Sequence, residues 1–273
     1  MSKNATKKVL FILAHPDDET IFFGNCITKL SEDGNEVHVL SLTNGERGFV
    51  HQQLDDGRVV RYVRNNDENL GNKRNQEFYD ACQSLGATKA WALGLPDGGV
   101  GAEHHTVLDT FVAELMPEEI YTFDPTGTSV HADHQACFFL SLHAAMAAPK
   151  TVRLYCPQKP AALVRSMDEW SRTNLEDKNN ESEVITGNEQ RILEAAAKYK
   201  DQSKLIGYFK RIGFLTASEE LCAVEVKWQD YHSVTEFSEK RVEELYVREL
   251  GQYAELCSNV SRLKEITGDR YLH

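Results

Sequence analysis

The stretch KVLFILAHPDDE, residues 8–19, decides the fold because it joins a buried strand to a polar turn. Its first seven residues are a short, almost wholly apolar run, as expected of a strand buried on both faces of a parallel sheet. Pro16 ends the strand, and three acidic residues follow it. Because functional groups collect at the carboxyl ends of parallel strands, the stretch predicts an α/β fold with a site at this edge.

Strand and helix patterns alternate through the first half of the chain. Apolar runs predict strands at 8–14, 36–42, 89–93, 119–123 and 152–156. Apolar residues at helical spacing predict helices at 19–31, 72–85, 107–116 and 134–147. This alternation favours a doubly wound, mostly parallel sheet sandwiched by helices, which is a Rossmann-like arrangement.

We expect a single domain over residues 1–273, with a core at 8–160 and a helical C-terminal extension at 161–273 that packs on it. Helices are predicted at 188–205 and 236–257, and loops at 55–72 and 177–183. The apolar stripe of the last helix could pack on the sheet or against a second copy of the chain. A homo-oligomer is therefore left open.

Composition narrows the class of partner. The 273 residues carry a formal net charge of -12, and such a surface repels nucleic-acid phosphates and anionic lipid headgroups. No apolar stretch approaches the length of a membrane span, so we expect no stable membrane insertion. The six cysteines form no CxxC pair, which indicates reduced, buried thiols and a cytoplasmic location.

A second polar cluster follows the fourth predicted strand. The segment DPTGTSVHADH, residues 124–134, ends in His131 and His134, and residues spaced i, i+3 near a helix start can face one cleft. Because both clusters follow the carboxyl ends of predicted parallel strands, the topology brings these histidines to the same edge, or rim, of the sheet as His15 and Asp18. Imidazole nitrogens and a carboxylate that leave one position open suit a catalytic zinc. Either cluster alone would fit helix caps and solvated acids better, but both at matching strand ends favour a metal site.

Five motifs now carry a resemblance to a known family. They are AHPDDE at 14–19, TNGERG at 43–48, Arg74-x-x-Glu77, LGLPDG at 93–98 and HADH at 131–134. In this order they resemble the PIG-L/LmbE-type N-acetylglucosaminyl deacetylases, over residues 8 to 148. That family includes N-acetylglucosaminyl-phosphatidylinositol, mycothiol-pathway and bacillithiol-pathway deacetylases. The segment YKDQS, residues 199–203, is similar to a weaker pattern of the family.

The resemblance implies a metal centre and a set of catalytic residues. The metal would be Zn²⁺, or another divalent transition metal, held by His15, Asp18 and His134. Asp17 would be the general base. His131, in its protonated form, would stabilise the oxyanion, and Asp133 would orient His131.

The substrate-binding residues are less specific. The resemblance implies that Arg74 and Asp97 hold the sugar or its aglycone, while Arg47 lies in a turn that could line the cleft. Some members carry a tyrosine before the second histidine motif, where this chain has Thr128 and Ser129. The remaining histidines, among them His104, His105 and His143, have no partner that the sequence indicates.

The implied reaction is zinc-dependent hydrolysis of an N-acyl group, expected to be N-acetyl, from a small amino-sugar-type molecule. One alternative is an amidase that acts on a thiol-sugar conjugate or an antibiotic-like amide, and another is a catalytically silent metal- or sugar-binding relative. A nucleotide-binding oxidoreductase would need a glycine-rich turn after the first strand, where this chain has HPDDE.

Overall fold

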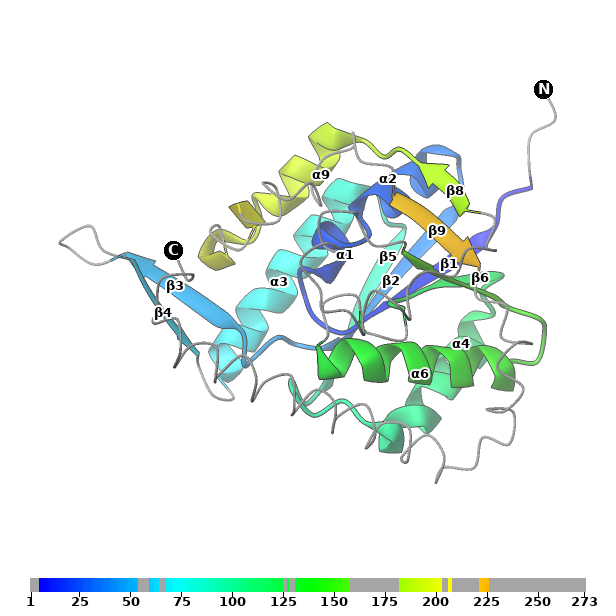
Figure 1. Cartoon of the computed structure of the whole chain (residues 1–273), viewed down its shortest axis with the longest axis horizontal. Coiled ribbons are helices and arrows are strands. Elements are labelled where there is room, and N and C mark those ends of the chain that lie inside the picture. Colours follow the sequence, from blue (N-terminus) through cyan, green and yellow to red (C-terminus); the bar gives the residue numbers. More distant parts are fainter. Residues whose placement is uncertain are drawn as a thin grey trace, which may run out of the picture.

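The structure is a computed structural model that describes residues 5–53, 59–63, 67–124, 127, 131–157, 182–202, 206–207 and 221–225. Within them, seven strands form one sheet in the order β5-β2-β1-β6-β7-β9-β8 (Figure 1). Their bounds are β1 Lys8–Leu13, β2 Glu36–Thr43, β5 Lys89–Leu95, β6 Glu119–Tyr121, β7 Arg153–Pro157, β8 Ser182–Ile185 and β9 Leu221–Glu225. The five neighbouring strands β5, β2, β1, β6 and β7 run parallel to one another. Strand β9 runs antiparallel to both of its neighbours, β7 and β8.

Helices cover both faces of the sheet, as predicted. Helices α1, α2, α3 and α9 lie on one face, and α4 and α6 lie side by side on the other (Figure 1). Their bounds are α1 Asp18–Ile21, α2 Gly24–Glu32, α3 Glu68–Leu85, α4 His105–Leu115, α6 Ala132–Ala147 and α9 Glu189–Ala196. Two short 3-10 helices, η1 Ala102–His104 and η2 Lys200–Gln202, precede α4 and follow α9. The predicted doubly wound, mostly parallel sandwich is confirmed. The C-terminal extension, which was predicted to be helical, also contributes two strands of the sheet, β8 and β9.

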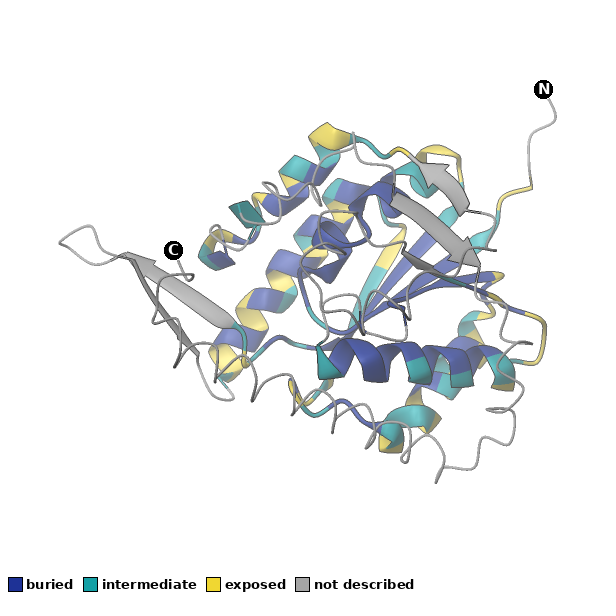
Figure 2. Ribbon diagram, viewed as in Figure 1, coloured by how far each residue is buried: buried dark blue, intermediate teal, exposed yellow. Residues whose placement is uncertain are grey.

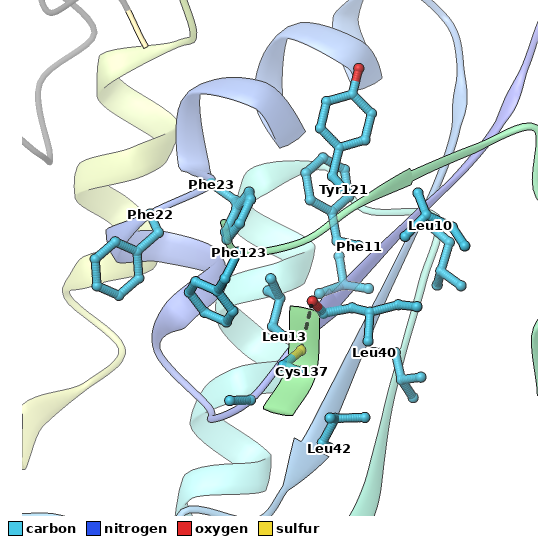
Figure 3. Close-up of a cluster of buried hydrophobic side chains, with 14 of the residues drawn as sticks. Leu10, Phe11, Leu13, Phe22, Phe23, Leu40, Leu42, Tyr121, Phe123 and Cys137 are labelled. Carbon is cyan, nitrogen blue, oxygen red and sulfur yellow. Dashed lines mark hydrogen bonds between the residues drawn. The ribbon is translucent and has the colours of Figure 1, made fainter. Parts of the chain in front are cut away.

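The core lies on both sides of the central strand β1. All residues from Val9 to Ala14 are fully buried (Figure 2). The Phe11 ring stacks on Tyr121 of the neighbouring strand, with ring centroids 4.9 Å apart. On the α6 side, the Cys137 thiol donates to the Ile12 carbonyl at 3.2 Å (Figure 3). Truncating a core side chain such as Leu13 to alanine would cost about 2–5 kcal/mol, since the packing would be left with a cavity.

The winding of the sheet fixes where the site lies. From β1 the chain proceeds to β2 and β5 on one side, then returns to form β6 and β7 on the other. The carboxyl ends of β1 and β6 therefore flank the point where the strand order reverses, which is the usual ligand crevice of such sheets. Because Phe11 pairs with Tyr121, the turn after β1 and the loop after β6 leave the sheet beside each other.

The predicted helix at 19–31 is two helices. Helix α1 ends at Ile21 and α2 begins at Gly24. Between them, Phe22 and Phe23 are both buried and both contact Phe123, with ring centroids 5.7 and 5.5 Å apart. The break lets two consecutive aromatic rings reach one core residue, which adjacent positions of a continuous helix do not do.

The predicted loop at 55–72 is wrong for most of its length. Strand β4, Val59–Val63, pairs antiparallel with β3, Phe49–Gln53, and helix α3 begins at Glu68. The valines of β4 are typical strand formers. At the start of α3 the carboxylate of Asp67 accepts hydrogen bonds from the backbone N–H groups of Asn69 and Leu70, which is an N-cap.

Other predictions meet the structure only in part. The helix predicted at 188–205 ends at Ala196 and is followed by η2. The helix predicted at 236–257 and residues 177–181 lie outside the described residues. Cys26, Cys82 and Cys137 are buried free thiols, as predicted. None of the described helices is both long and apolar enough to cross a membrane.

Candidate metal centre and active site

The turn HPDDE is a strained, buried connection between β1 and α1. Asp17 adopts φ 114°, a conformation that L-residues rarely take. Such a residue costs about 1–3 kcal/mol and persists only where its surroundings hold it. The backbone N–H of Asp17 donates to Glu19 Oε2 at 2.9 Å, and the Asp17 side chain is also held from the C-terminal part of the chain. Strain at this position is a mark of a functional turn.

Three predicted metal ligands meet at this turn. His15 Nδ1 lies 3.2 Å from His134 Nε2. The Asp18 carboxylate lies 3.3 Å from His134 Nε2 through Oδ1 and 3.6 Å from His15 Nδ1 through Oδ2. Ligands about 2.0–2.1 Å from a tetrahedral zinc are about 3.3 Å from one another, so these separations fit such an ion. His15, His131 and His134 also form a group whose ring nitrogens could hold a metal.

Groups outside the triangle of ligand side chains, His15, Asp18 and His134, fix the ring of His15. His15 Nε2 lies 3.0 Å from Asp133 Oδ2 and 3.4 Å from Asp97 Oδ1. The backbone N–H groups of Gly98 and Val100 donate to the two oxygens of Asp133, at 2.7 and 3.2 Å. With Nε2 engaged by carboxylates, Nδ1 of His15 is the nitrogen turned towards the other ligands. A carboxylate behind a histidine is the usual support of a metal-binding imidazole.

The tautomer of His134 is set by a backbone carbonyl. Its Nδ1–H donates to the Gly127 carbonyl at 3.0 Å, because a carbonyl oxygen can only accept. The neutral ring therefore presents the lone pair of Nε2 to the triangle. The ring stacks on Phe123, with centroids 3.9 Å apart and planes inclined by 9°. The Gly127 carbonyl and the Phe123 ring thus preset this ligand.

Charge is balanced within the triangle. Burial alone would lower the pKa of His15, but the carboxylates of Asp133, Asp18 and Asp97 outweigh it and raise that pKa well above its usual value. Burial would raise the pKa of Asp18, but the two histidines lower it instead. The site thus keeps an ionised carboxylate in a buried position, and this negative charge suits a cation.

Asp17 has the environment of a general base. Burial and the neighbouring Asp18 carboxylate raise its pKa well above the usual value, while the charge of Arg74 opposes the shift. A raised pKa makes a carboxylate a stronger proton acceptor near neutral pH. The side-chain N–H of Gln202, in η2, donates to Asp17 Oδ2. This contact joins residues 185 positions apart and fixes one of the two carboxylate oxygens.

Glu19 is a second buried acid at the turn. Its Oε1 accepts hydrogen bonds from Thr20 at 2.6 Å and from the Tyr199 hydroxyl at 2.7 Å. Burial raises the pKa of Glu19 to about 7. Tyr199 and Gln202 therefore anchor the turn from the C-terminal side. The sequence assigned no role to Glu19, Tyr199 or Gln202, although the segment at 199–203 was the one signal available for the last two.

His131 caps helix α6 with its side chain. The backbone N–H of Asp133 donates to His131 Nδ1 at 3.2 Å, so the neutral ring carries its proton on Nε2. Burial and then the charges of His15 and His134 lower the pKa of His131 to about 3. This low pKa favours a neutral donor over the protonated form that the family resemblance implies. Asp133 contacts two histidines through different groups: its carboxylate contacts His15, and its backbone N–H contacts His131.

The three predicted substrate-binding residues differ in exposure. Arg74 is 1% exposed and packs beside Gly45 and Gly48 in the loop after β2. Asp97 is also buried, and its Oδ2 accepts from the backbone N–H of Arg47 at 2.8 Å. The Arg47 residue is exposed, and its guanidinium donates to the Asp97 carbonyl at 3.3 Å. Of the three, Arg47 has the most access to a molecule in solution. Thr128 and Ser129 lie outside the described residues.

Comparison with known proteins identifies the family of the chain. Residues 10–145 match the family model PIG-L, described as GlcNAc-PI de-N-acetylase. The 1D-myo-inositol 2-acetamido-2-deoxy-alpha-D-glucopyranoside deacetylase of Mycolicibacterium smegmatis is 31% identical over 209 residues. The match covers 65% of this chain and 71% of the relative.

Solved structures share the fold at lower identity. N,N'-diacetylchitobiose deacetylase from Pyrococcus horikoshii aligns with a TM-score of 0.57 at 20% identity, over 86% of this chain and 88% of its own. The 4-carboxy-2-hydroxymuconate hydratase of Pseudomonas putida aligns equally well, with a TM-score of 0.57 at 19% identity over 81% of this chain and 95% of its own. The fold thus serves more than one reaction, and the family is decided by the sequence match. The chain belongs to the PIG-L family of de-N-acetylases and is a hydrolase that acts on amides.

Proposed function

We propose that this chain releases acetate from the N-acetyl group of a small amino-sugar-type molecule, with zinc held by His15, Asp18 and His134. The observation that carries the proposal is the meeting of three ligand side chains beside the buried Asp17. His15 Nδ1 lies 3.2 Å from His134 Nε2, and the Asp18 carboxylate lies 3.3 Å from His134 through Oδ1 and 3.6 Å from His15 through Oδ2. The deacetylases of similar sequence act on an acetamido sugar by name, which supports an amino-sugar substrate here.

Zinc would supply what the side chains lack. When bound, it lowers the pKa of a water molecule to about 7 and polarises a carbonyl oxygen. Both effects are needed, because neutral water is a poor nucleophile and an amide carbonyl is a poor electrophile. The Irving–Williams order and the mixed nitrogen and oxygen ligands leave room for another divalent transition metal.

Asp17 is assigned as the general base. Gln202 engages Oδ2, so Oδ1 is the oxygen that we assign to the proton of the attacking water. The raised pKa of Asp17 suits this task near neutral pH, while Asp18 beside it is committed to the metal. After the attack, Asp17 carries the proton that the leaving amine needs. Proton transfer to the nitrogen then allows the C–N bond to break.

His131 is assigned to the carbonyl oxygen. Its Nδ1 is engaged by the backbone of Asp133, so the Nε2–H is the group that can donate to a developing oxyanion. The neutral form suffices for this role, because a hydrogen bond needs a donor rather than a full charge. Asp133 supports the reaction through His15 and through the start of α6.

We assign the substrate-binding residues by exposure. Arg47 is the residue of this group that can reach the sugar or its aglycone. Asp97 positions Arg47 and His15, and Arg74 contributes a buried positive charge that restrains the pKa of Asp17. All three remain part of the proposed substrate side of the site.

Acetate release from a panel of N-acetylglucosamine derivatives tests the proposal. Release that a chelator abolishes and zinc restores would support it. Release from a thiol-sugar conjugate or an antibiotic-like amide alone would support a different amide substrate. Stoichiometric zinc binding with no release from any amide would point to a catalytically silent relative and would overturn the assignment.

A further inference from the structure

Helices α4 and α6, which lie side by side on one face of the sheet (Figure 1), carry a second cluster of side chains of the types that bind metals. His105 is the first residue of α4, and Asp109 follows it at i+4 on the same face. His143 lies in the second half of α6. The three ligand atoms lie within 4.8 Å of one another.

One carboxylate bridges the two rings of this helix cluster, which consists of His105, Asp109 and His143. His105 Nδ1 lies 3.2 Å from Asp109 Oδ2, and His143 Nδ1 lies 2.9 Å from Asp109 Oδ1. The ring centroids are 5.0 Å apart with the planes inclined by 63°. Both Nδ1 atoms are therefore turned towards the same carboxylate.

We propose that the helix cluster binds a divalent transition-metal ion and so joins α4 to α6. Two imidazole nitrogens and one carboxylate oxygen are the ligands that Zn²⁺, Cu²⁺ and Ni²⁺ accept. The two nitrogens lie 3.2 and 2.9 Å from the two different oxygens of Asp109, and one ligand atom from each of the three residues lies within 4.8 Å of the others, close enough to meet at one ion. The cluster differs from the proposed catalytic centre in every residue.

Exposure gives an ion a way in. The three side chains are between 23% and 27% exposed, so the cluster is neither closed to solvent nor fully hydrated. Water can complete the coordination of an ion with three protein ligands. Binding requires that the proton on each Nδ1 leave, so the affinity should fall as the histidines become protonated.

A bound ion would stabilise the pair of helices. A ligand that binds the folded state alone raises the free energy of unfolding by RT ln(1 + [L]/Kd). The function would be structural, since no group of the proposed reaction lies in the cluster.

Metal stoichiometry tests the inference independently of the deacetylase reaction. The metal-free full chain is titrated with Zn²⁺, and bound zinc is measured after equilibrium dialysis. The wild type is expected to bind two equivalents, and Asp109→Asn and His143→Ala one each. His104→Gln is the matched control, because His104 neighbours the cluster but meets the backbone of Gly101 instead. This control should bind two.

Three further readouts separate the outcomes. Circular dichroism without metal checks that each variant folds. If His143→Ala does not fold, Asp109→Asn still tests the proposal, because it preserves the size of the side chain. Zinc should raise the melting temperature of a His134→Ala variant, whose catalytic centre is disabled, but not of His134→Ala combined with Asp109→Asn. Acetate release should be unchanged in Asp109→Asn. Equal zinc stoichiometry in the wild type and in Asp109→Asn would overturn the proposal, whatever the deacetylase assay gives.

Discussion

Two histidine–carboxylate clusters share helix α6 but differ in what surrounds them. The rim cluster, formed by His15, Asp18 and His134, is nearly closed, with side chains 14%, 3% and 5% exposed. The side chains of the helix cluster are 23% to 27% exposed. Similar ligand types at similar distances thus occur in two very different environments.

Support from other residues is the second difference. At the rim, Asp133 and Asp97 hold the far nitrogen of His15, so the ligand carboxylate Asp18 and the supporting carboxylates are separate groups. In the helix cluster, one carboxylate, Asp109, contacts both rings and would itself be the ligand. We infer that burial, together with supporting carboxylates separate from the ligand carboxylate, distinguishes the site where a reaction is prepared.

The largest effect is expected from Asp17→Asn. The amide cannot accept the water proton, so kcat should fall by about 10²–10⁴-fold, the usual contribution of a general base. Zinc stoichiometry should be unchanged, because Asp17 is not one of the proposed ligands. Steady-state acetate release and bound zinc are measured on the same preparation. Wild-type kcat in this variant would contradict the assignment, and Asp109→Asn serves as the control with intact activity.

The next effect is expected from Asp133→Asn. Its amide keeps the size of the side chain but weakens the support of His15, and loss of such support typically lowers metal affinity about 10–100-fold. Competition with a chelator of known affinity measures the change at the rim. Zinc affinity of the helix cluster, measured in a His134→Ala background, should not change. A rim affinity equal to that of the wild type would show that His15 needs no such support.

The sequence predicted the parallel sheet and the rim residues because both depend on local signals. The apolar run of β1 and the polar turn after it are adjacent in the chain, and strand order then follows from the alternation of strands and helices. The break between helices α1 and α2 at Phe22 could not be predicted, because it depends on contacts with Phe123, which follows a strand distant in the sequence. Helix periodicity alone continues through such a position.

The C-terminal anchor and the helix cluster were not predicted for a similar reason. Gln202 reaches Asp17 across 185 residues, and one glutamine in a polar segment has no pattern that indicates such a contact. His105 and Asp109 have helical spacing, but His143 comes from another helix, so only the packing of α4 on α6 completes the cluster. Long-range partners of polar residues need the tertiary structure.

A moderate effect is expected from Gln202→Ala. The Asp17 carboxylate would lose the donor that fixes Oδ2, and kcat should fall on the order of tenfold, the value of one hydrogen bond to a charged group. The KM and zinc stoichiometry should stay as in the wild type, which a general loss of structure would not allow. Gln190→Ala is the matched control, since Gln190 is exposed on α9 and contacts Glu194. Unchanged kcat in Gln202→Ala would show that the hydrogen bond from Gln202 to Asp17 does not contribute to the reaction.

The smallest effect on the reaction is expected from Glu19→Gln. Its main expected consequence is a change in how the stability of the protein depends on pH. Burial raises the pKa of Glu19 from 4.5 to about 7, so the folded protein binds more protons than the unfolded chain between these values. The contribution of Glu19 to stability is therefore fully present below pH 4.5 and is lost as the pH rises to about 7. The variant does not titrate, so its urea midpoint relative to that of the wild type should be higher at pH 8 than at pH 5. Glu194→Gln, on the exposed side of α9, should shift the midpoint equally at both pH values. A constant difference for Glu19→Gln would mean that the buried carboxyl does not change its protonation in this range, and the buried acids beside the rim cluster would then not make stability depend on pH.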